Sequence, residues 1–200
     1  MKAKFIAFEG GDASGKSTQA RRVSEIIDAV FTREPGGTTV GESLRTILLD
    51  PNETVAVRAE ALLMAASRAQ LVADVITPAL AQERHVVTDR FLASSLAYQG
   101  YASGLPVDEV LSLSLFATES LIPDLTVLID IPIEESIKRR GQSPDRFEQE
   151  NRSFHEKVRK GYLELAEAEK EKWVVIDGTG TVEEVSLLVD QAIKERLGLP

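Results

Sequence analysis

Residues 4–18 read KFIAFEGGDASGKST, and this stretch decides the fold of the chain. Its first five residues have the composition of a buried strand, and a glycine-rich turn leads from them straight into helix-forming sequence. Gly10, Gly15, Lys16 and Ser17 satisfy the phosphate-binding pattern G-x-x-x-x-G-K-[ST]. Because strand, loop and helix follow in the required order, a plain glycine-rich surface turn is the weaker interpretation. The sequence predicts a phosphate-binding loop.

Such a loop binds phosphate mainly through its backbone. Glycines let successive N–H groups point inward as an anion nest, and the following helix adds the positive end of its dipole. Lys16 can reach the terminal phosphates, and the Ser17 hydroxyl can ligate magnesium. We therefore expect ATP to lie along the whole loop. Its residues are Gly10, Gly11, Asp12, Ala13, Ser14, Gly15, Lys16, Ser17 and Thr18.

Composition narrows the class of protein. The chain has 200 residues, 43% apolar and 28% charged, which is enough for one α/β domain spanning 1–200. A net charge of −9 argues against a partner that is a nucleic acid or an anionic membrane. The absence of cysteine excludes disulfides and thiolate metal sites. No segment has the pattern of a signal peptide or a membrane span, so we expect a cytoplasmic protein.

Strand-like and helix-like segments alternate along the chain. Further strands are predicted at 29–32, 85–89, 125–130 and 173–177. Most are apolar without alternation, which is typical of a parallel sheet buried on both faces. The fold class we predict is therefore a three-layer α/β/α domain of the P-loop NTPase type, with a five-stranded parallel sheet.

The helices carry more specific expectations. Residues 19–28 are expected to form a helix with Val23, Ile26 and Ile27 on its buried face. A long helix from about residue 57 is expected to kink or restart near Pro78, and residues 100–104 to form a loop. Thr181, followed three residues later by glutamate, predicts a capping box for the last helix.

Two further polar clusters fall where strands are predicted to end, at 33–38 and 89–90. Ligands of such sheets lie beyond the carboxyl ends of the strands. Asp89 can hold a magnesium-bound water, and the fork of Arg90 can bridge donor and acceptor phosphates. The alternative is a surface ion pair that ends the strand. With the phosphate loop upstream, the functional interpretation is favoured.

Several other arginines are candidates for anion binding. Arg45 and Arg68 lie on separate helices, and either alone is more typical of a solvated surface arginine; Arg68 is the better candidate because it interrupts an apolar stretch. Arg139, Arg140 and Arg146 flank a glycine-proline turn, and a lid there, about 139–150, would close over the phosphates and exclude water. The alternative is a charged helix end that its dipole favours.

These motifs resemble those of the thymidylate kinase family. The resemblance rests on FEG-x-D-x-x-GKST at 8–18, TREPGGT at 32–38, DRF at 89–91 and AYQ at 97–99, in matching order along nearly the whole chain. The TREPGGT segment is far more specific than the phosphate loop. The resemblance implies transfer of the γ-phosphoryl group of ATP to dTMP with Mg²⁺, giving dTDP for dTTP biosynthesis. It also implies a homodimer formed through helix packing, for which the apolar helices around 44–48, 62–72 and 111–116 are candidates.

The resemblance also assigns roles to residues. Asp12 would face the deoxyribose 3′-hydroxyl, and Tyr98 would crowd the 2′ position. Arg45, Arg68 and Arg90 would surround the monophosphate and base, with Pro35, Ser95 and Gln99 near the nucleoside. Met64 stands where the family usually has a phenylalanine that stacks on thymine, so aromatic stacking is missing there. The implied catalytic residues are Lys16, Arg90, Arg139 and Arg140, and the implied metal ligands are Ser17 and Asp89.

One family variant has a catalytic arginine inside the phosphate loop, where this chain has Ala13, and the other has it in the lid. The chain is similar to the second, bacterial type. Replacing Arg139 or Arg140 by alanine is therefore expected to lower turnover more than dTMP binding.

Two other functions compete with this interpretation. A kinase acting on dUMP or on a deoxynucleoside is possible on the same scaffold, because one methyl group in a pocket gives only ~1–3 kcal/mol of discrimination. A nucleotide-dependent switch would need a base-reading motif such as Asn-Lys-x-Asp, which the sequence lacks. It would also leave the acceptor-side arginines without a purpose.

Overall fold

The computed structural model describes residues 2–139 and 145–200. At its centre is a five-stranded, all-parallel sheet in the order β2-β3-β1-β4-β5, which confirms the predicted sheet. The strands are β1 (Phe5–Glu9), β2 (Val30–Arg33), β3 (Val86–Asp89), β4 (Leu125–Asp130) and β5 (Trp173–Asp177). Phe8 in the central strand is level with Asp89 on one side and Val127 on the other. The phosphate loop therefore leaves the sheet at the same height as Asp89.

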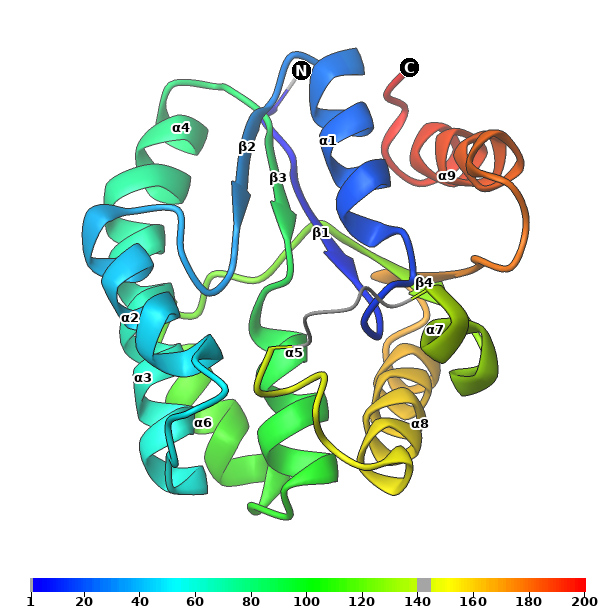
Figure 1. Ribbon diagram of the computed structural model, residues 1–200. Coiled ribbons are helices and arrows are strands. Elements are labelled where there is room, and N and C mark those ends of the chain that lie inside the picture. The colour runs from blue at the N-terminus through cyan, green and yellow to red at the C-terminus, as the bar shows by residue number, and fades with distance from the viewer. Residues whose placement is uncertain (1, 140–144) are drawn as a thin grey trace.

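Helices alternate with the strands and cover the sheet (Figure 1). Their bounds are α1 (Lys16–Ile26), α2 (Thr39–Leu49), α3 (Val57–Leu71), α4 (Thr77–Ala81), α5 (Leu92–Ser95), α6 (Val107–Ala117), α7 (Ile133–Arg139), α8 (Arg152–Ala168) and α9 (Val182–Leu197). Two π-helical segments, η1 (Val72–Ile76) and η2 (Leu96–Ala102), continue α3 and α5. No helix in the described part of the chain is both long and apolar enough to cross a membrane.

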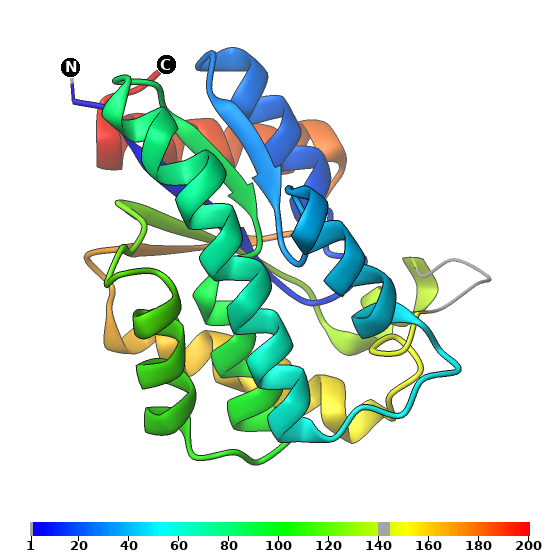
Figure 2. The same ribbon diagram turned by 90° about the vertical axis from the view of Figure 1, so that its left-hand side faces the viewer.

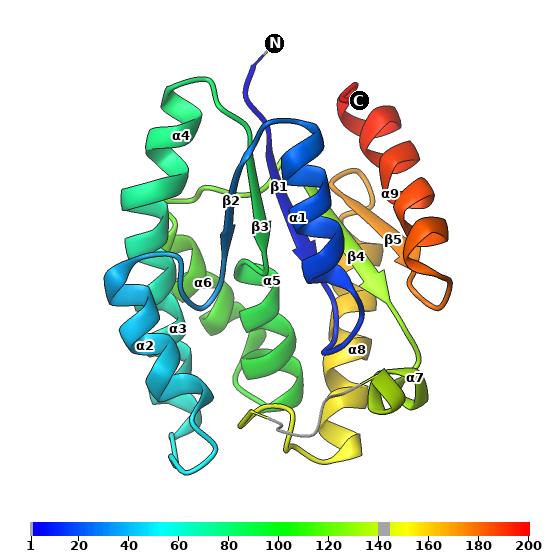
Figure 3. The same cartoon turned by 45° about the horizontal axis from the view of Figure 1, so that its top comes forward.

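Alternate residues of β1 point into two different cores, because side chains of a strand alternate between the faces of the sheet. Ile6 and Phe8 pack against α1 and α9, and Phe5 and Ala7 pack against η1 and α4. In Figure 3, α1 and α9 lie in front of the strands, with α8 behind them. This arrangement gives the three layers that the uninterrupted apolar strands predict.

A third core joins the sheet to the site. Leu128 of β4 packs there with Val158 and Tyr162 of α8 and with residues of α5 and η2. Trp173, the single tryptophan of the chain, belongs to the same core and is only 8% exposed. The core therefore connects β4 and β5 with Tyr98 and Phe147, which line the cavity described below.

The expectations for the helices are partly confirmed. α4 restarts the long helix around Pro78, after the π-helical turn, and the capping box at Thr181 is present. The predicted burial of Ile26 is wrong: the residue is 47% exposed, whereas Val23 and Ile27, the other two residues predicted for that face, pack into the core. The predicted loop at 100–104 is wrong at its start, because η2 extends the helical backbone to Ala102.

The two loops that leave neighbouring strands β1 and β3 diverge. β1 continues into α1 on one face of the sheet, and β3 continues into α5 on the opposite face. Figure 2 shows α6, α3 and α2 side by side on one flank of the molecule, with α3 between the other two. A crevice at the carboxyl ends of the strands is the expected consequence of such divergence.

Candidate active site

A cavity of about 290 Å³ lies at these strand ends. It contains residues from the phosphate loop, from the ends of β2 and β3, and from α2, α3, α5 and η2. All nine residues for which the resemblance implies substrate contact line it: Asp12, Pro35, Arg45, Met64, Arg68, Arg90, Ser95, Tyr98 and Gln99. Lys16, Ser17 and Asp89 line the same cavity. The phosphate loop and the arginine cluster therefore share one cleft.

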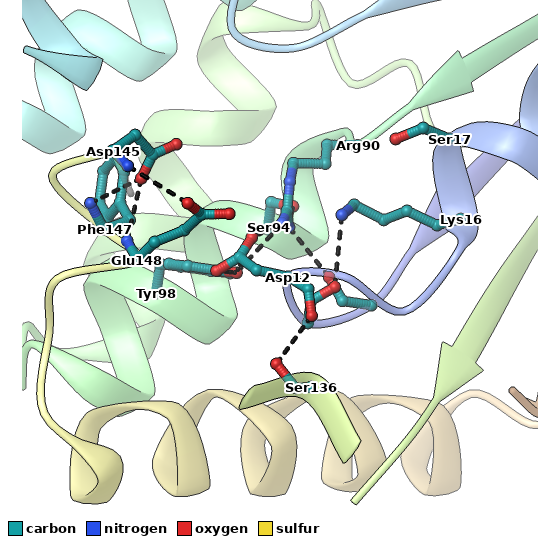
Figure 4. Close-up of polar contacts among 12 residues, drawn as sticks. Asp12, Lys16, Ser17, Arg90, Ser94, Tyr98, Ser136, Asp145, Phe147 and Glu148 are labelled. Carbon is teal, nitrogen blue, oxygen red and sulfur yellow. Dashed lines mark hydrogen bonds and ion pairs between the residues drawn. The ribbon is translucent and has the colours of Figure 1, made fainter. Parts of the chain in front are cut away.

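The phosphate loop has the backbone that its sequence requires. Gly10 has a φ of +148°, and a Cβ atom there would lie 2.5 Å from the Ile129 carbonyl oxygen. Gly15, just before α1, has a φ of +90°. The Lys16 ammonium folds back over the loop and donates to the Gly11 carbonyl at 3.3 Å (Figure 4). Burial lowers the pKa of Lys16, and the nearby Arg90 lowers it further.

The side chains of Ser17 and Asp89 meet beside the loop. The Ser17 hydroxyl donates to Oδ2 of Asp89 at 2.5 Å, which joins the first turn of α1 to the end of β3. Oδ1 of Asp89 is buried and has no hydrogen-bond partner among the described residues. A hydroxyl and a carboxylate with a spare buried oxygen match the ligands that magnesium prefers.

Arg90 lies at the centre of the hydrogen-bond network in the cavity. It follows β3 with a left-handed backbone (φ +72°), which turns its side chain back across the sheet edge towards the loop. Its guanidinium donates to Oδ1 of Asp12 at 2.7 Å, to the Tyr98 hydroxyl at 3.1 Å and to the Gly10 carbonyl at 3.1 Å. Figure 4 shows Arg90, Asp12 and Tyr98 converging between Lys16 and the segment that carries Phe147.

Burial alone would lower the pKa of Arg90, but Tyr98, Tyr162, Asp12 and Asp89 around it raise that pKa well above its ordinary value. For the Tyr98 hydroxyl, burial acts in the opposite direction and raises the pKa. At neutral pH Arg90 is therefore a fixed cation. Tyr98 remains protonated and donates to both oxygens of Asp12, each at 3.3 Å.

A second set of hydrogen bonds holds Arg90 on the side that faces away from the cavity. The Tyr162 hydroxyl accepts from Arg90 at 3.1 Å and donates to the fully buried Glu9 at 2.9 Å. Glu9 also accepts from the Ser94 hydroxyl at 2.6 Å and from the Phe91 N–H at 2.9 Å. Burial raises the pKa of Glu9. This network fixes the direction of the Arg90 side chain before any ligand arrives.

Arg68 forms the floor of the cavity together with Glu34. The two side chains are 1% and 3% exposed and approach to 2.7 Å. The rest of the guanidinium donates to Ser114, to the Phe91 carbonyl and to the Ser95 hydroxyl. Burial raises the pKa of Glu34 to about 7, although Arg68 acts in the opposite direction. Arg68 is therefore a buried structural cation at the cavity wall, and not the solvated surface residue that its position alone suggested.

The cavity is positive in a negative protein. Arg45 donates to the Pro35 carbonyl at 2.8 Å, and burial lowers its pKa with a further contribution from Arg33. Among the described lining residues, six are cationic and four acidic, whereas the whole chain has a net charge of −9. The cationic members are Lys16, Arg21, Arg33, Arg45, Arg68 and Arg90. This excess favours an anionic ligand at this place.

The structure places Arg139 and Arg146, two of the three proposed lid arginines, outside the lining of the cavity. Arg139 lies in the last turn of α7, pairs with Glu135 at 2.8 Å and donates to the carbonyls of Gly178 and Thr179. It does not line the cavity, so its placement follows the helix-end alternative. Arg146 is held by Glu60 at 2.7 Å. Arg140 lies outside the described residues.

Several cavity residues were not singled out from the sequence. Phe147 lies within the segment of about 139–150 that is proposed as the lid, and it lines the cavity. Its ring meets that of Tyr98 edge to face at 5.7 Å. Arg21, Phe31 and Asp145 also line it. A clue existed for Phe31, which lies in β2, two residues before the carboxyl end of the strand. None existed for Phe147, because its position depends on the long-range packing of the segment that carries it.

Comparisons with known proteins show that the chain is similar to members of one protein family. The profile of the family described as "Thymidylate kinase" matches residues 8–189. The chain is 47% identical to the thymidylate kinase of Caldanaerobacter subterraneus subsp. tengcongensis, with 98% of each chain covered. It is 46% identical to that of Symbiobacterium thermophilum, covering 96% of this chain and 94% of the relative.

A solved structure gives the same likeness. The crystal structure of thymidylate kinase from Ehrlichia chaffeensis matches with a TM-score of 0.79 and 31% identity. The match covers 97% of this chain and 99% of the other. The likeness therefore includes the sheet, the phosphate loop and the segments that form the cavity.

Proposed function

The chain belongs to the thymidylate kinase family and is a nucleoside monophosphate kinase, and we propose that it transfers the γ-phosphoryl group of ATP to dTMP, giving dTDP and ADP for dTTP synthesis. The alternative, another kinase on the same fold, is not favoured, since the similar proteins named above are thymidylate kinases over nearly their full length.

The observation that carries this proposal is the shared cleft. A backbone anion nest with Lys16 opens into the same cavity as Arg45 and Arg90. The nest and the N-terminus of α1 suit a triphosphate, and the arginines suit a second, smaller anion. Two phosphate sites that face each other are what phosphoryl transfer between nucleotides needs.

The chemistry asked of the protein is positioning and charge stabilisation. A phosphate monoester is largely a dianion near neutral pH, so its oxygen needs no general base to attack. Arg90 would neutralise charge on both phosphates, because its guanidinium lies between the loop and Tyr98. Asp12 would accept from the 3′-hydroxyl of the acceptor nucleotide, and Tyr98 would fill the space that a 2′-hydroxyl needs.

Magnesium fits the residues present. Ser17 and Asp89 would hold it, since their oxygens lie side by side and one Asp89 oxygen is buried without a partner in the described part of the chain. When bound, the ion supplies charge neutralisation for the oxygens of ATP.

We also propose that residues 1–200 act as one domain whose segment of about 139–150 serves as the lid, with Arg139 and Arg140 as its candidate catalytic arginines. Supporting this, Asp145 and Phe147, which belong to the segment, line the cavity. Arg139 would have to leave Glu135 to reach a phosphate. Cytoplasmic localisation stays a prediction from the sequence.

The proposed quaternary structure is a homodimer through α2, α3 and α6. These helices pack against one another on the flank seen in Figure 2. Each presents a large apolar side chain to solvent: Ile47 is 46% exposed, Leu62 58% and Phe116 86%. A second copy covering this face is what the family resemblance implies, and it would remove that apolar surface from water.

A coupled assay of ADP release tests the proposed function. Purified protein with ATP and Mg²⁺ is measured with dTMP, dUMP, the thymine ribonucleotide, thymidine or no acceptor. We expect fast ADP release with dTMP alone among these. A Lys16→Met variant, which keeps the side-chain bulk and removes the ammonium, is the matched control and should be inactive. ADP release that does not depend on any acceptor would contradict the proposal.

A further inference from the structure

Behind the cavity wall lies a buried glutamate whose two oxygens have different partners. Glu60 of α3 is 4% exposed and does not line the cavity. Its Oε1 accepts from Nε2 of Gln99 at 2.7 Å, and its Oε2 pairs with the guanidinium of Arg146 at 2.7 Å. Each partner belongs to the cavity wall or adjoins it: Gln99 lines the cavity, and Arg146 precedes Phe147.

The bond from Gln99 fixes which end of its amide is used. An ionised carboxylate only accepts hydrogen bonds, so Glu60 must be met by the NH₂ end of Gln99. Oε1 of Gln99 then remains, buried at the cavity wall and without a hydrogen-bond partner among the described residues. A buried amide oxygen in that state is costly unless a ligand supplies a donor.

The pair with Arg146 fixes the position of the Glu60 side chain. The two side chains are 14% and 5% exposed, and Nη2 of Arg146 lies 2.7 Å from Oε2 of Glu60. Arg146 is itself held in place, since its Nε donates to the Leu48 carbonyl at 2.9 Å and its guanidinium lies 4.4 Å from the centre of the Phe147 ring. A carboxylate presents one oxygen to each partner, whereas a glutamine at position 60 would put an NH₂ group in place of one of them.

We infer that Glu60 is a positioning residue for base selection: by orienting the Gln99 amide it presents an acceptor, and not a donor, to the nucleobase. The N3 position of thymine carries a hydrogen and donates, whereas N3 of cytosine accepts. The fixed amide therefore favours dTMP over dCMP. This inference rests on the proposed function, and Glu60 acts through Gln99 without contacting the substrate.

The test compares kcat/KM for dTMP with kcat/KM for dCMP in wild type and in Glu60→Gln. A glutamine at 60 can donate to Oε1 of Gln99, which lets the amide turn and present its NH₂ group. We expect the ratio in favour of dTMP to fall by about tenfold or more, with a raised KM for dTMP. Glu109→Gln is the matched control, because that glutamate pairs with Arg58 of α3 on the surface. Its ratio should equal that of wild type.

Two further variants separate positioning from a merely structural role. Glu60→Asp keeps the charge that faces Arg146 but shortens the reach to Gln99, so its ratio should also fall; it replaces Glu60→Gln if that variant does not fold. In a Gln99→Leu background, Glu60→Gln should no longer change the ratio, since the residue through which it acts is gone. An unchanged ratio in folded Glu60 variants overturns the inference. Failure of wild type to phosphorylate dTMP overturns the proposed function instead.

Discussion

Single residues in this protein are held by networks, and Arg90 is the clearest case. Its guanidinium is bound on both sides, by Asp12 and Tyr98 towards the cavity and by Tyr162 and Ser94 below. A charge alone would not need such holding, whereas a planar fork aimed at phosphate oxygens does. The left-handed backbone at this residue belongs to the same arrangement.

Replacing Arg90 by lysine should therefore be damaging although it conserves charge. We expect kcat with dTMP to fall by about 10²- to 10³-fold, because an ammonium cannot contact two phosphates in the geometry of the fork. Steady-state kinetics give the answer. Arg22→Lys, in an arginine that pairs with Asp190 away from the cavity, is the control and should keep wild-type kcat. An unchanged kcat in Arg90→Lys would contradict the role.

Glu34 makes stability depend on pH. Its pKa is raised from 4.5 to about 7 in the folded protein, mainly by burial, so the folded state binds this proton more tightly than the unfolded state. The stability that it contributes is fully present below pH 4.5 and is lost as the pH rises through about 7.

Denaturant unfolding across that pH range checks this behaviour. Glutamine resembles the protonated acid, so Glu34→Gln should lack this share of the decline in the free energy of unfolding. The exposed Glu53→Gln serves as a control with the wild-type slope. Equal slopes in wild type and Glu34→Gln would show that Glu34 does not titrate in this range.

At the scale of elements, the turn between β1 and α1 depends on one glycine more than on its neighbour. Gly10 has positive φ, and a methyl group there would collide with the Ile129 carbonyl and the Ser14 hydroxyl. Gly11 has open space around the same position. The sequence motif already assigns its first fixed glycine to Gly10 and a variable position to Gly11, and the structure supplies the physical reason.

Gly10→Ala should lower the free energy of unfolding by about 1–3 kcal/mol and abolish stabilisation by ATP, because the loop backbone must shift. Gly11→Ala should stay within about 0.5 kcal/mol of wild type. Denaturant unfolding with and without Mg-ATP measures both. If the two variants were equally stable, the close approach to Ile129 would not constrain the loop.

Sequence reasoning succeeded where the signal was local. The phosphate loop, the strands and the capping box at Thr181 depend on residues a few positions apart. Many cavity residues were also within reach, because parallel strands end at a shared edge. It failed at Ile26, the last residue of α1, which is exposed although Val23 and Ile27 are buried.

Long-range packing was not predictable from one sequence. Arg146 bonds the Leu48 carbonyl, 98 positions away, and this contact helps to bring Phe147 to the cavity. No periodicity encodes such a contact. The same holds for Glu60, which reads as one more charge on a helix until Gln99 and Arg146 are seen on its two oxygens.

At the scale of the whole molecule, exposed apolar residues are unevenly distributed, and α6 carries the most exposed of them. Phe116→Glu places a charge where the proposed dimer would bury a ring, and we expect a monomer at micromolar concentration while wild type sediments as a dimer. Sedimentation velocity distinguishes the two. Leu187→Glu, at a 70% exposed position on α9, is the control and should leave the wild-type value unchanged. A monomeric wild type would remove the dimer proposal.

Trp173 gives the molecule a single indole emitter, buried at the start of β5 in the core that also contains Tyr98, Phe147 and Tyr162. The tryptophan fluorescence of the protein therefore comes from one known environment, because no second tryptophan contributes to the emission. Loss of that core would move the emission to longer wavelength, and seating of a nucleotide against Tyr98 and Phe147 would alter its intensity. The protein thus contains its own optical reporter, placed on the far side of the wall that its substrate touches.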